Sequence, residues 1–454
     1  MCRENLGSLR SVADRLVVIG GDAAGMTAAT NARRGRPDLE IVVLEKGPHT
    51  SYSACGIPYV VSGAVGGLDD LIVRTPQEFR DGFRIDVRTR HEARSIDLDA
   101  RRIEVRALDQ ERTLHLGFDL LHIATGARPL RPDLPGIDGQ DIYGVQTLDD
   151  AQLLLDAVEA RTRRTVAVVG GGYIGLEMAE AFVRRGARVT LIDEGAQPMR
   201  SLDPDMGAKV AAAVRRFGIA LRTSTKVEGF EPGVVHTDQG DVPADLVILG
   251  LGVAPNSAVG VEAGLEAGAG GALAVDHRQR TSREGIYAAG DCADVRHQVS
   301  GERLHLALGT VANKTGRVAG INLGGGYASF PGVLGTAVTR VCDVEIARTG
   351  LSQAQADAAG IECLVGTVEA TTRAAYYPGA EALHARVLVE KGSGRLVGGQ
   401  LVGADRAGKR IDTVAAAITA GMTASQFVDL DLAYAPAVSP MWDAFALAAR
   451  ATLG

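Results

Sequence analysis

Two stretches of the chain repeat the same order of apolar and small residues. The first has an apolar run of strand length at 16–19, a glycine turn at 20–25, a helix of small residues to about Arg34, and an apolar run at 41–44. Residues 166–192 repeat this order. Continuous apolar strands alternating with helices are typical of parallel sheets whose two faces are covered. The pattern therefore predicts two α/β units.

Beyond about residue 330 the pattern changes. Residues 382–389 and 396–402 alternate as antiparallel strands do, and helical patterns follow near 411–421 and 441–450. We expect an α/β fold with two Rossmann-like dinucleotide-binding domains and a C-terminal α+β domain. The expected parts are an N-terminal tail at 1–14, a first nucleotide domain at 15–125 and 255–329, a second at 126–254, and the α+β domain at 330–454.

The second glycine turn carries a complete dinucleotide fingerprint. Gly170, Gly172 and Gly175 have the G-x-G-x-x-G spacing, a strand precedes them, and Asp193 follows at the end of the next strand. Such a turn presents backbone N–H groups and a helix N-terminus to a pyrophosphate, while the acid accepts hydrogen bonds from ribose hydroxyls. We expect a dinucleotide here.

The first glycine turn departs from this fingerprint at one position. Gly20 and Gly25 are in place and Glu45 ends the following strand, but Asp22 stands where the middle glycine belongs. A carboxylate there would repel a pyrophosphate unless it points away. The strand before the turn and the helix after it still predict a second bound nucleotide.

Cys55 is the strongest candidate for redox chemistry. It lies in Ser51-Tyr-Ser-Ala-Cys-Gly-Ile-Pro-Tyr59, where Pro58 fits the first turn of a helix and Gly63 its C-cap. The positive end of a helix favours a thiolate, and such cysteines can have pKa values lowered to roughly 3.5–7.5. The alternative is an inert packing cysteine. Because no second cysteine lies nearby, oxidation would be held as a mixed disulfide, a sulfenic acid or a persulfide.

Composition excludes several classes of protein. A net charge of −7 without a large basic block makes nucleic acid an unlikely partner, and no apolar run is long enough to span a membrane. Five cysteines without framework spacing argue against structural disulfides and indicate a cytoplasmic protein. No His/Cys group has the spacing of metal ligands, so we expect no metal.

Several segments together resemble one family, the flavoprotein pyridine nucleotide–disulfide oxidoreductases, in their single-cysteine group of coenzyme A disulfide reductases, NADH oxidases and NADH peroxidases. The segments that carry the resemblance are 51–59, 124–126, 289–291, 376–379, 409–412 and 434–436. The family tail usually reads Tyr-Ala-Pro-Pro, whereas Ala437 and Val438 follow Pro436 here.

The resemblance implies two cofactors and a homodimer. FAD would lie on the first unit, with Glu45 on its ribose and Asp291 on its ribityl chain, and NADH on the second. Further FAD contacts implied by the resemblance are Lys46, Thr125 and Gly126. The domain from 330 would pair two copies and place Tyr376 and Tyr434 over the partner's Cys55, where a phenol can protonate a departing thiolate.

One position separates activities within the group. The oxidases and peroxidases carry a histidine inside the first glycine turn, and Ala23 stands there in this chain. The resemblance therefore implies an NADH-dependent reductase of coenzyme A disulfide or a related small disulfide or persulfide, with Ser51, Asn31 and Arg34 on the substrate. The alternatives are an NADH oxidase and a redox-sensing flavoprotein.

The second unit also predicts which nicotinamide cofactor is used. Asp193 and Glu194 offer carboxylates to a 2′-hydroxyl, and no Lys or Arg follows before Arg200. A 2′-phosphate would meet negative charge there. We expect a higher kcat/KM for NADH than for NADPH in steady-state assays; an equal or higher value for NADPH would contradict this expectation.

Overall fold

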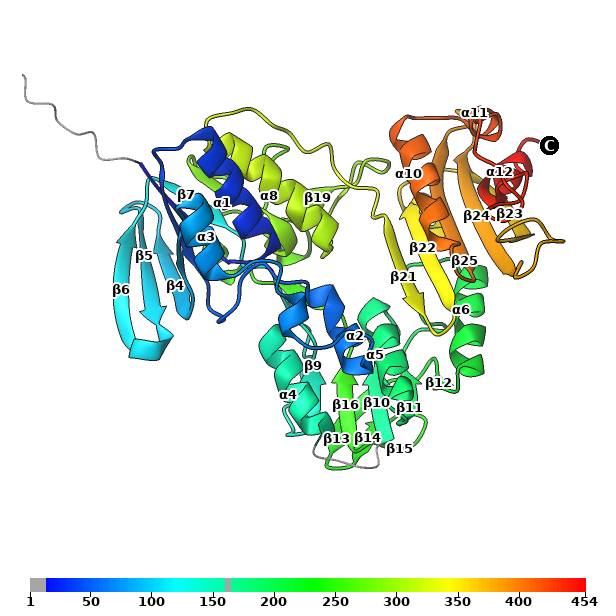
Figure 1. The fold of residues 1–454 in the computed structure, drawn as a ribbon, viewed down its shortest axis with the longest axis horizontal. Helices are drawn as coiled ribbons and strands as arrows, with labels where there is room; N and C mark the ends of the chain where they lie inside the picture. The colour runs from blue at the N-terminus through cyan, green and yellow to red at the C-terminus, as the bar shows by residue number, and fades with distance from the viewer. Residues whose placement is uncertain (1–13, 160–164) are drawn as a thin grey trace, which may run out of the picture.

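The computed structural model describes residues 14–159 and 165–454, so the expected tail lies outside the described residues except for Asp14. The first nucleotide unit is built on a parallel sheet with strand order β18-β7-β1-β2-β3. Its strands are β1 (Arg15–Ile19), β2 (Glu40–Leu44), β3 (Asp86–Arg88), β7 (Leu120–Ile123) and β18 (Ile286–Ala288). Helix α1 (Ala23–Gly35) lies beside α8 (Gly309–Leu323), and both cover one face of this sheet (Figure 1).

The second unit repeats this topology. Its sheet has the order β12-β11-β10-β16-β9, with β10 in the central position that β1 occupies in the first. The strands are β9 (Ile142–Gly144), β10 (Thr165–Val169), β11 (Arg188–Ile192), β12 (Ala220–Arg222) and β16 (Leu246–Leu249), and the helices are α4 (Leu148–Glu159), α5 (Tyr173–Arg184) and α6 (Pro204–Arg216). The two predicted α/β units are confirmed.

The C-terminal part is an antiparallel sheet covered by helices. Its order is β21-β22-β25-β24-β23, from β21 (Ala337–Val341), β22 (Val344–Gly350), β23 (Cys363–Thr371), β24 (Ala382–Glu390) and β25 (Leu396–Gly403). The helices are α9 (Gln353–Ala358), α10 (Ile411–Thr419), α11 (Ala424–Val428) and α12 (Ala444–Arg450). Strand β25 is buried along its whole length rather than on alternate positions, because it lies in the middle of a sheet that α10 and α6 contact.

Two small antiparallel sheets were not predicted. One is β4 (His91–Asp97), β5 (Arg102–Ala107) and β6 (Arg112–Gly117); the other is β13 (Val227–Glu231), β14 (Val234–Thr237) and β15 (Val242–Pro243). The strand pair β8 (Ala127–Pro129) and β17 (Val253–Pro255) joins the two nucleotide units. We propose 126, 255 and 330 as domain boundaries: 126 lies between β7 and β8, 255 is the last residue of β17, and 330 lies between α8 and β21.

The short helix α2 (Ile57–Ser62), which follows Cys55, is part of a core shared by all three parts of the chain. Ile57 and Val61 are fully buried in one apolar cluster with Phe182 of α5 and Ile346 of β22. Because one partner belongs to a helix of the second nucleotide unit and the other to the C-terminal sheet, the position of α2 depends on the packing of all three parts of the chain. Among the described residues, no helix has the length and apolarity needed to cross a bilayer.

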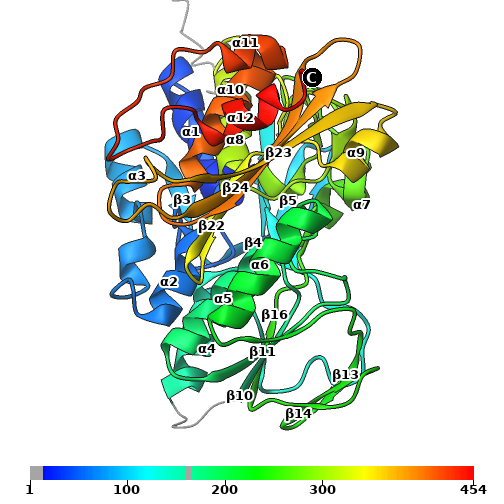
Figure 2. The same cartoon turned by 90° about the vertical axis from the view of Figure 1, so that its right-hand side faces the viewer.

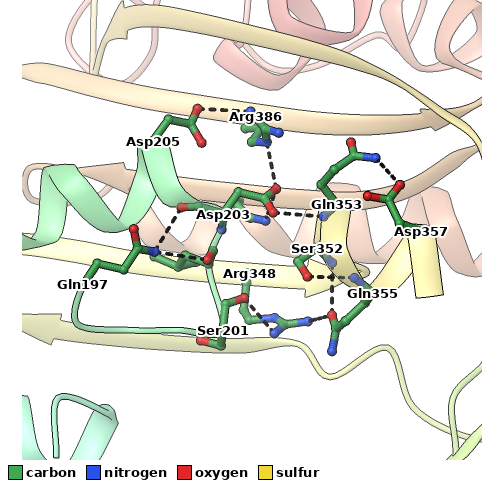
Figure 3. Close-up of polar contacts among 12 residues, drawn as sticks. Gln197, Ser201, Asp203, Asp205, Arg348, Ser352, Gln353, Gln355, Asp357 and Arg386 are labelled. Carbon is green, nitrogen blue, oxygen red and sulfur yellow. Dashed lines mark hydrogen bonds and ion pairs between the residues drawn. The ribbon is translucent and has the colours of Figure 1, made fainter. Parts of the chain in front are cut away.

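A buried polar cluster joins the second nucleotide unit to the C-terminal sheet (Figure 3). The Asp203 side chain is 3% exposed and accepts hydrogen bonds from Arg386 Nε (2.8 Å) and Gln400 Nε2 (2.9 Å). Arg348 donates to the carbonyl oxygen of Ser201 at 2.9 Å. The segment before α6 is therefore held by charged and amide side chains of three strands.

Loss of the Asp203 carboxylate should destabilise the protein strongly. Asp203→Ala leaves Arg386 without its buried partner, and we expect a loss of about 3 kcal/mol in the free energy of unfolding, measured by urea titration. Asp205→Ala is the matched control, since Asp205 also pairs with Arg386 but is 49% exposed; its loss should stay below about 1 kcal/mol. Equal losses in the two variants would show that the buried pair is not what stabilises this contact.

Candidate functional site

The first and third glycines of both turns are required by close backbone contacts. Gly20 has a φ of +108°, and a Cβ there would lie 2.0 Å from the carbonyl oxygen of Ala124. A Cβ on Gly175 would lie 1.8 Å from the carbonyl oxygen of Gly170, and one on Gly25 would meet Gly20 in the same way at 1.9 Å. Gly172, in contrast, faces open space. The middle position therefore leaves room for a ligand, and it is the position where a side chain is sterically allowed.

The two strand-end acids hold their glycine turns identically. Glu45 accepts from the backbone N–H of Gly21 at 2.7 Å, and Asp193 accepts from that of Gly171 at 2.6 Å. Each carboxylate also accepts a second backbone N–H two residues further along the chain. Burial raises the pKa of Glu45. Because a carboxylate oxygen can accept more than one hydrogen bond, both acids keep capacity for ribose hydroxyls.

The carboxylate of Asp22 is directed toward the backbone of Tyr52. Its Oδ1 accepts from the backbone N–H of Tyr52 at 3.2 Å, and so it faces the segment that carries Cys55. Burial raises its pKa to about 6, with a smaller contribution from the charge of Glu45. The raised pKa leaves Asp22 mostly charged near neutral pH, so the repulsion that the sequence suggested is lessened mainly by the direction of the carboxylate.

Asp291 provides the clearest sign that the first unit holds a ligand. Its Oδ1 is buried without a hydrogen-bond partner, and burial raises its pKa. A buried carboxylate oxygen without a donor is costly, so this atom fits the hydroxyl of a bound group such as the ribityl chain of FAD. The other residues expected at FAD have protein partners: the Thr125 hydroxyl and the Gly126 carbonyl bond Asn256, and Lys46 pairs with Glu92 at 2.9 Å.

Cys55 lies in a short turn, Ala54–Gly56, directly before α2. Pro58 occupies the first turn of this helix and Gly63 caps it with a φ of 80°, as predicted. The residue as a whole is exposed, but the protein around the thiol displaces enough water to raise its pKa, and the charges of Glu177 and Asp291 raise it further. The expected depressed pKa was wrong, because desolvation by the surrounding protein, together with these carboxylates, favours the neutral thiol.

Glu177 is a residue of this site that sequence reasoning missed. It lies on α5, accepts a hydrogen bond from the Thr339 hydroxyl at 2.5 Å, and has its pKa raised by burial. Its charge raises the pKa of both Cys55 and Tyr59, and it does so more than any other charge near either group. An acid within the otherwise apolar start of this helix was the available signal.

Tyr376 and Tyr434 lie together, but far from the sulfur of their own chain. The hydrogen bond that the Tyr434 hydroxyl shares with Tyr376 raises the pKa of Tyr434, and the two residues, Tyr376 and Tyr434, are 77% and 44% exposed. They belong to the loops that follow β23 and α11. Figure 1 places α2 near the middle of the molecule's long axis and the β23–β24 loop at the end formed by the C-terminal domain, and Figure 2 shows both loops along one edge of that domain. A single chain therefore does not unite these phenols with Cys55.

The proposed substrate residues occupy two places. Asn31 and Arg34 line a cavity of about 400 Å³ between the C-terminal ends of α1 and α8. Ser51 lies at the other end of α1, where its N–H donates to the carbonyl oxygen of Gly21 at 3.0 Å. Eleven helical rises separate Ala23 from Arg34, or roughly 17 Å. A ligand that contacts both places must be long.

Within residues 14–159 and 165–454, no group of three His, Cys, Asp or Glu side chains is arranged to hold a metal ion. The four cysteines described there are all free; Cys292 and Cys342 are buried and Cys363 is partly covered, so Cys55 is the exposed one.

Comparison with known proteins places this arrangement in context. Residues 14–316 match the family model described as pyridine nucleotide-disulphide oxidoreductase, and residues 336–445 match the dimerisation domain of the same family. The chain is 38% identical to the NAD(P)H coenzyme A polysulfide/persulfide reductase of Pyrococcus horikoshii, over 96% of this chain and 98% of the relative.

Two further matches also cover nearly all of this chain. An NADH oxidase of Methanocaldococcus jannaschii is 36% identical over 97% of this chain and 98% of its own length. The solved structure of an NAD-dependent persulfide reductase from A. fulgidus superposes with a TM-score of 0.92 at 38% identity, covering 96% of this chain and 82% of that one.

The charge of Glu177 should slow the reaction of Cys55 with electrophiles. Glu177→Gln keeps an acceptor for Thr339 but removes the negative charge, so more thiolate forms at a given pH. We expect the iodoacetamide alkylation rate of Cys55 at pH 7 to rise roughly threefold, with the midpoint of the pH–rate profile moved to lower pH.

Glu180→Gln is the control, because Glu180 lies on the same helix but accepts from the backbone N–H of Cys342. Its alkylation profile should match that of the unaltered protein. An unchanged profile in Glu177→Gln would contradict the electrostatic role of Glu177.

Proposed function

Because this chain belongs to the pyridine nucleotide–disulphide oxidoreductase family, we propose that it is an FAD-dependent NADH:disulfide reductase that acts through Cys55. Its substrate would be coenzyme A disulfide or a related small disulfide or persulfide. The observation that carries the proposal is the single exposed cysteine of the described chain, placed directly before α2 and in the field of Asp291, whose free oxygen suits FAD.

The chemistry begins with the sulfur of Cys55. As thiolate, it attacks one sulfur of the substrate, forms a mixed disulfide with that half, and releases the other half as a thiolate. When bound, FAD supplies two electrons taken from NADH, which cleave the mixed disulfide and restore Cys55. The balance is one NADH, one proton and one disulfide consumed, and one NAD⁺ and two thiols formed.

Release of the first thiolate is easier if a proton is delivered to it. Tyr376 and Tyr434 carry phenols that can donate one, and they are hydrogen-bonded to each other on an exposed edge. Since they lie far from the Cys55 of their own chain, we propose that a partner subunit supplies them in a homodimer. The match of residues 336–445 to a dimerisation domain supports this assembly.

The form of the substrate site favours an elongated thiol that carries anionic groups. Arg34 is one helix length from the turn beside Cys55 and lines an open cavity together with Asn31. Coenzyme A combines a thiol with a long arm and phosphates, which a guanidinium binds well. The name of the Pyrococcus horikoshii relative supports the same compound class.

An NADH oxidase is the second candidate, and the name of the Methanocaldococcus jannaschii relative favours it. In that reaction, Cys55 would cycle as a sulfenic acid. Ala23 argues against it, because a methyl group in the first glycine turn supplies neither a hydrogen-bond donor nor a proton.

Assays in air separate the two candidates. We expect NADH consumption by the FAD-loaded enzyme to be slow alone and to rise at least tenfold on addition of coenzyme A disulfide, with two thiols released per NADH. Rapid turnover without any disulfide would favour the oxidase instead.

Cys55→Ser should abolish thiol release, by roughly a thousandfold or more, because the nucleophile is lost. Bleaching of the flavin by NADH under anaerobic conditions should persist, since it does not use the sulfur. Retained thiol release in Cys55→Ser would overturn the proposal.

Tyr376→Phe should lower kcat roughly tenfold, because a proton donor to the departing thiolate is lost, while leaving the bleaching of the flavin by NADH unchanged.

A further inference from the structure

Asp22 stands at the start of α1 but does not cap this helix. It is the N-cap residue, where an aspartate commonly accepts a hydrogen bond from a backbone N–H of the first turn, yet no side-chain hydrogen bond caps α1. Its carboxylate accepts instead from the N–H of Tyr52, 30 residues along the chain, at 3.2 Å. The N–H groups of the first helical turn therefore remain available for a bound phosphate, and the contact that Asp22 makes leads toward Cys55.

The N–H of Tyr52 points toward Asp22 because of the way its segment is paired. Tyr52 forms an antiparallel bridge with Ile72. The hydrogen bonds on either side of this bridge join the neighbouring residues, Val73 to Ser51 at 2.9 Å and Ser53 to Leu71 at 2.8 Å. In such a pair the two central residues direct their own N–H groups away from each other. Tyr52 thus needs an acceptor on its other side, and Asp22 supplies it.

The second nucleotide unit repeats these surroundings without the carboxylate. In both units a residue in the left-handed region, with a φ of 50° in the first and 54° in the second, donates its N–H to a carbonyl oxygen of the glycine turn. The two contacts are Ser51 to Gly21 at 3.0 Å and Met199 to Gly171 at 2.8 Å. The next residue of the turn is Asp22 in the first unit and Gly172 in the second. Since glycine has no side chain to offer, the additional contact belongs to the unit that carries the cysteine segment.

The backbone leads from this contact to the sulfur in a few residues. Ser53 follows Tyr52, and its carbonyl oxygen accepts, at 2.8 Å, the N–H that closes the turn Ala54–Gly56. Cys55 is the middle residue of that turn. The carboxylate also acts on the sulfur through its charge: after burial and two other acids, Asp22 adds to the rise in the pKa of Cys55. Asp22 therefore affects both the place and the electrostatic environment of the thiol.

We propose that Asp22 is a positioning residue for Cys55, whose carboxylate joins the cysteine segment to the first glycine turn through the N–H of Tyr52. A pyrophosphate bound at this turn would repel the carboxylate and so keep it on Tyr52. Binding of FAD and the position of the sulfur are then coupled. The inference rests on the proposed function in two respects, the assignment of FAD to the first turn and the redox role of Cys55.

Hydrogen exchange measures this contact directly. In the FAD-loaded protein, deuterium uptake at the Tyr52 amide would be followed by mass spectrometry with electron-transfer fragmentation. Asp22→Gly restores the glycine of the fingerprint and keeps an acceptable N-cap residue, but it removes the acceptor, so Tyr52 should exchange roughly tenfold faster or more. Asp22→Asn keeps an oxygen acceptor, and its exchange rate should stay within about threefold of that of the unaltered protein.

The affinity of the apoprotein for FAD separates the charge of Asp22 from its hydrogen bond. Both variants remove a negative charge beside the expected pyrophosphate, so both should bind FAD roughly threefold more tightly in a fluorescence titration. In the FAD-loaded enzyme, Asp22→Gly should lower kcat for disulfide reduction roughly fivefold with KM for NADH unchanged, because the sulfur is less well placed. Asp22→Asn should retain the kcat of the unaltered protein.

Asp238→Gly is the matched control. Asp238 also accepts a backbone N–H from a distant segment, that of Lys226 at 2.8 Å, but beside the small sheet of the second unit. Exchange at Tyr52, affinity for FAD and kcat should all stay as in the unaltered protein.

Two results would overturn the proposal: unchanged exchange at Tyr52 in Asp22→Gly, or exchange in Asp22→Asn as fast as in Asp22→Gly. Failure of the unaltered apoprotein to bind FAD would instead overturn the proposed function. The two failures are distinguishable, because exchange at Tyr52 can also be compared among the variants without FAD.

Discussion

The packing of α2 against α5 is the constraint on which the rest of the site depends. Ile57 and Val61 are fully buried against residues of the second nucleotide unit and the C-terminal sheet, and Cys55 lies just before them in the chain. This contact sets the sulfur at the meeting point of the two nucleotide units. It also brings Glu177 of α5 into the electrostatic environment of the thiol, so packing and reactivity have the same origin.

The raised pKa of Cys55 keeps its sulfur in the less reactive thiol form, which suits a site that is complete only when substrate and a partner subunit are bound. Burial and nearby carboxylates raise this pKa, and Asp291 Oδ1 is buried without a hydrogen-bond donor from the protein. The phenols that would assist release lie in the C-terminal domain, away from the Cys55 of the same chain. In the proposed mechanism, a complete site therefore needs a bound FAD and a second subunit.

The features that follow from local spacing could be predicted from the sequence. Both glycine turns, the acids Glu45 and Asp193, and the helix capped by Pro58 and Gly63 are local patterns, and the structure shows them as expected. The raised pKa of Cys55 and the closeness of Arg200 to Asp193 were missed, because each depends on contacts between elements that are distant in the sequence or on a loop that folds back. The sheet β4–β6 was missed for a different reason: β4 buries one residue and β6 none, so only the middle strand β5 buries alternate positions.

The central claim is that one chain contributes Cys55 and the other contributes the tyrosines, and a mixed dimer tests it most directly. Two differently tagged copies, one with Cys55→Ser and the other with both Tyr376→Phe and Tyr434→Phe, would be co-expressed and the heterodimer purified through both tags. If the site is shared, one of its two sites is wholly intact, and the heterodimer should release thiol from coenzyme A disulfide at about half the rate of the unaltered dimer. A rate no higher than half that of the double-tyrosine homodimer would contradict the account.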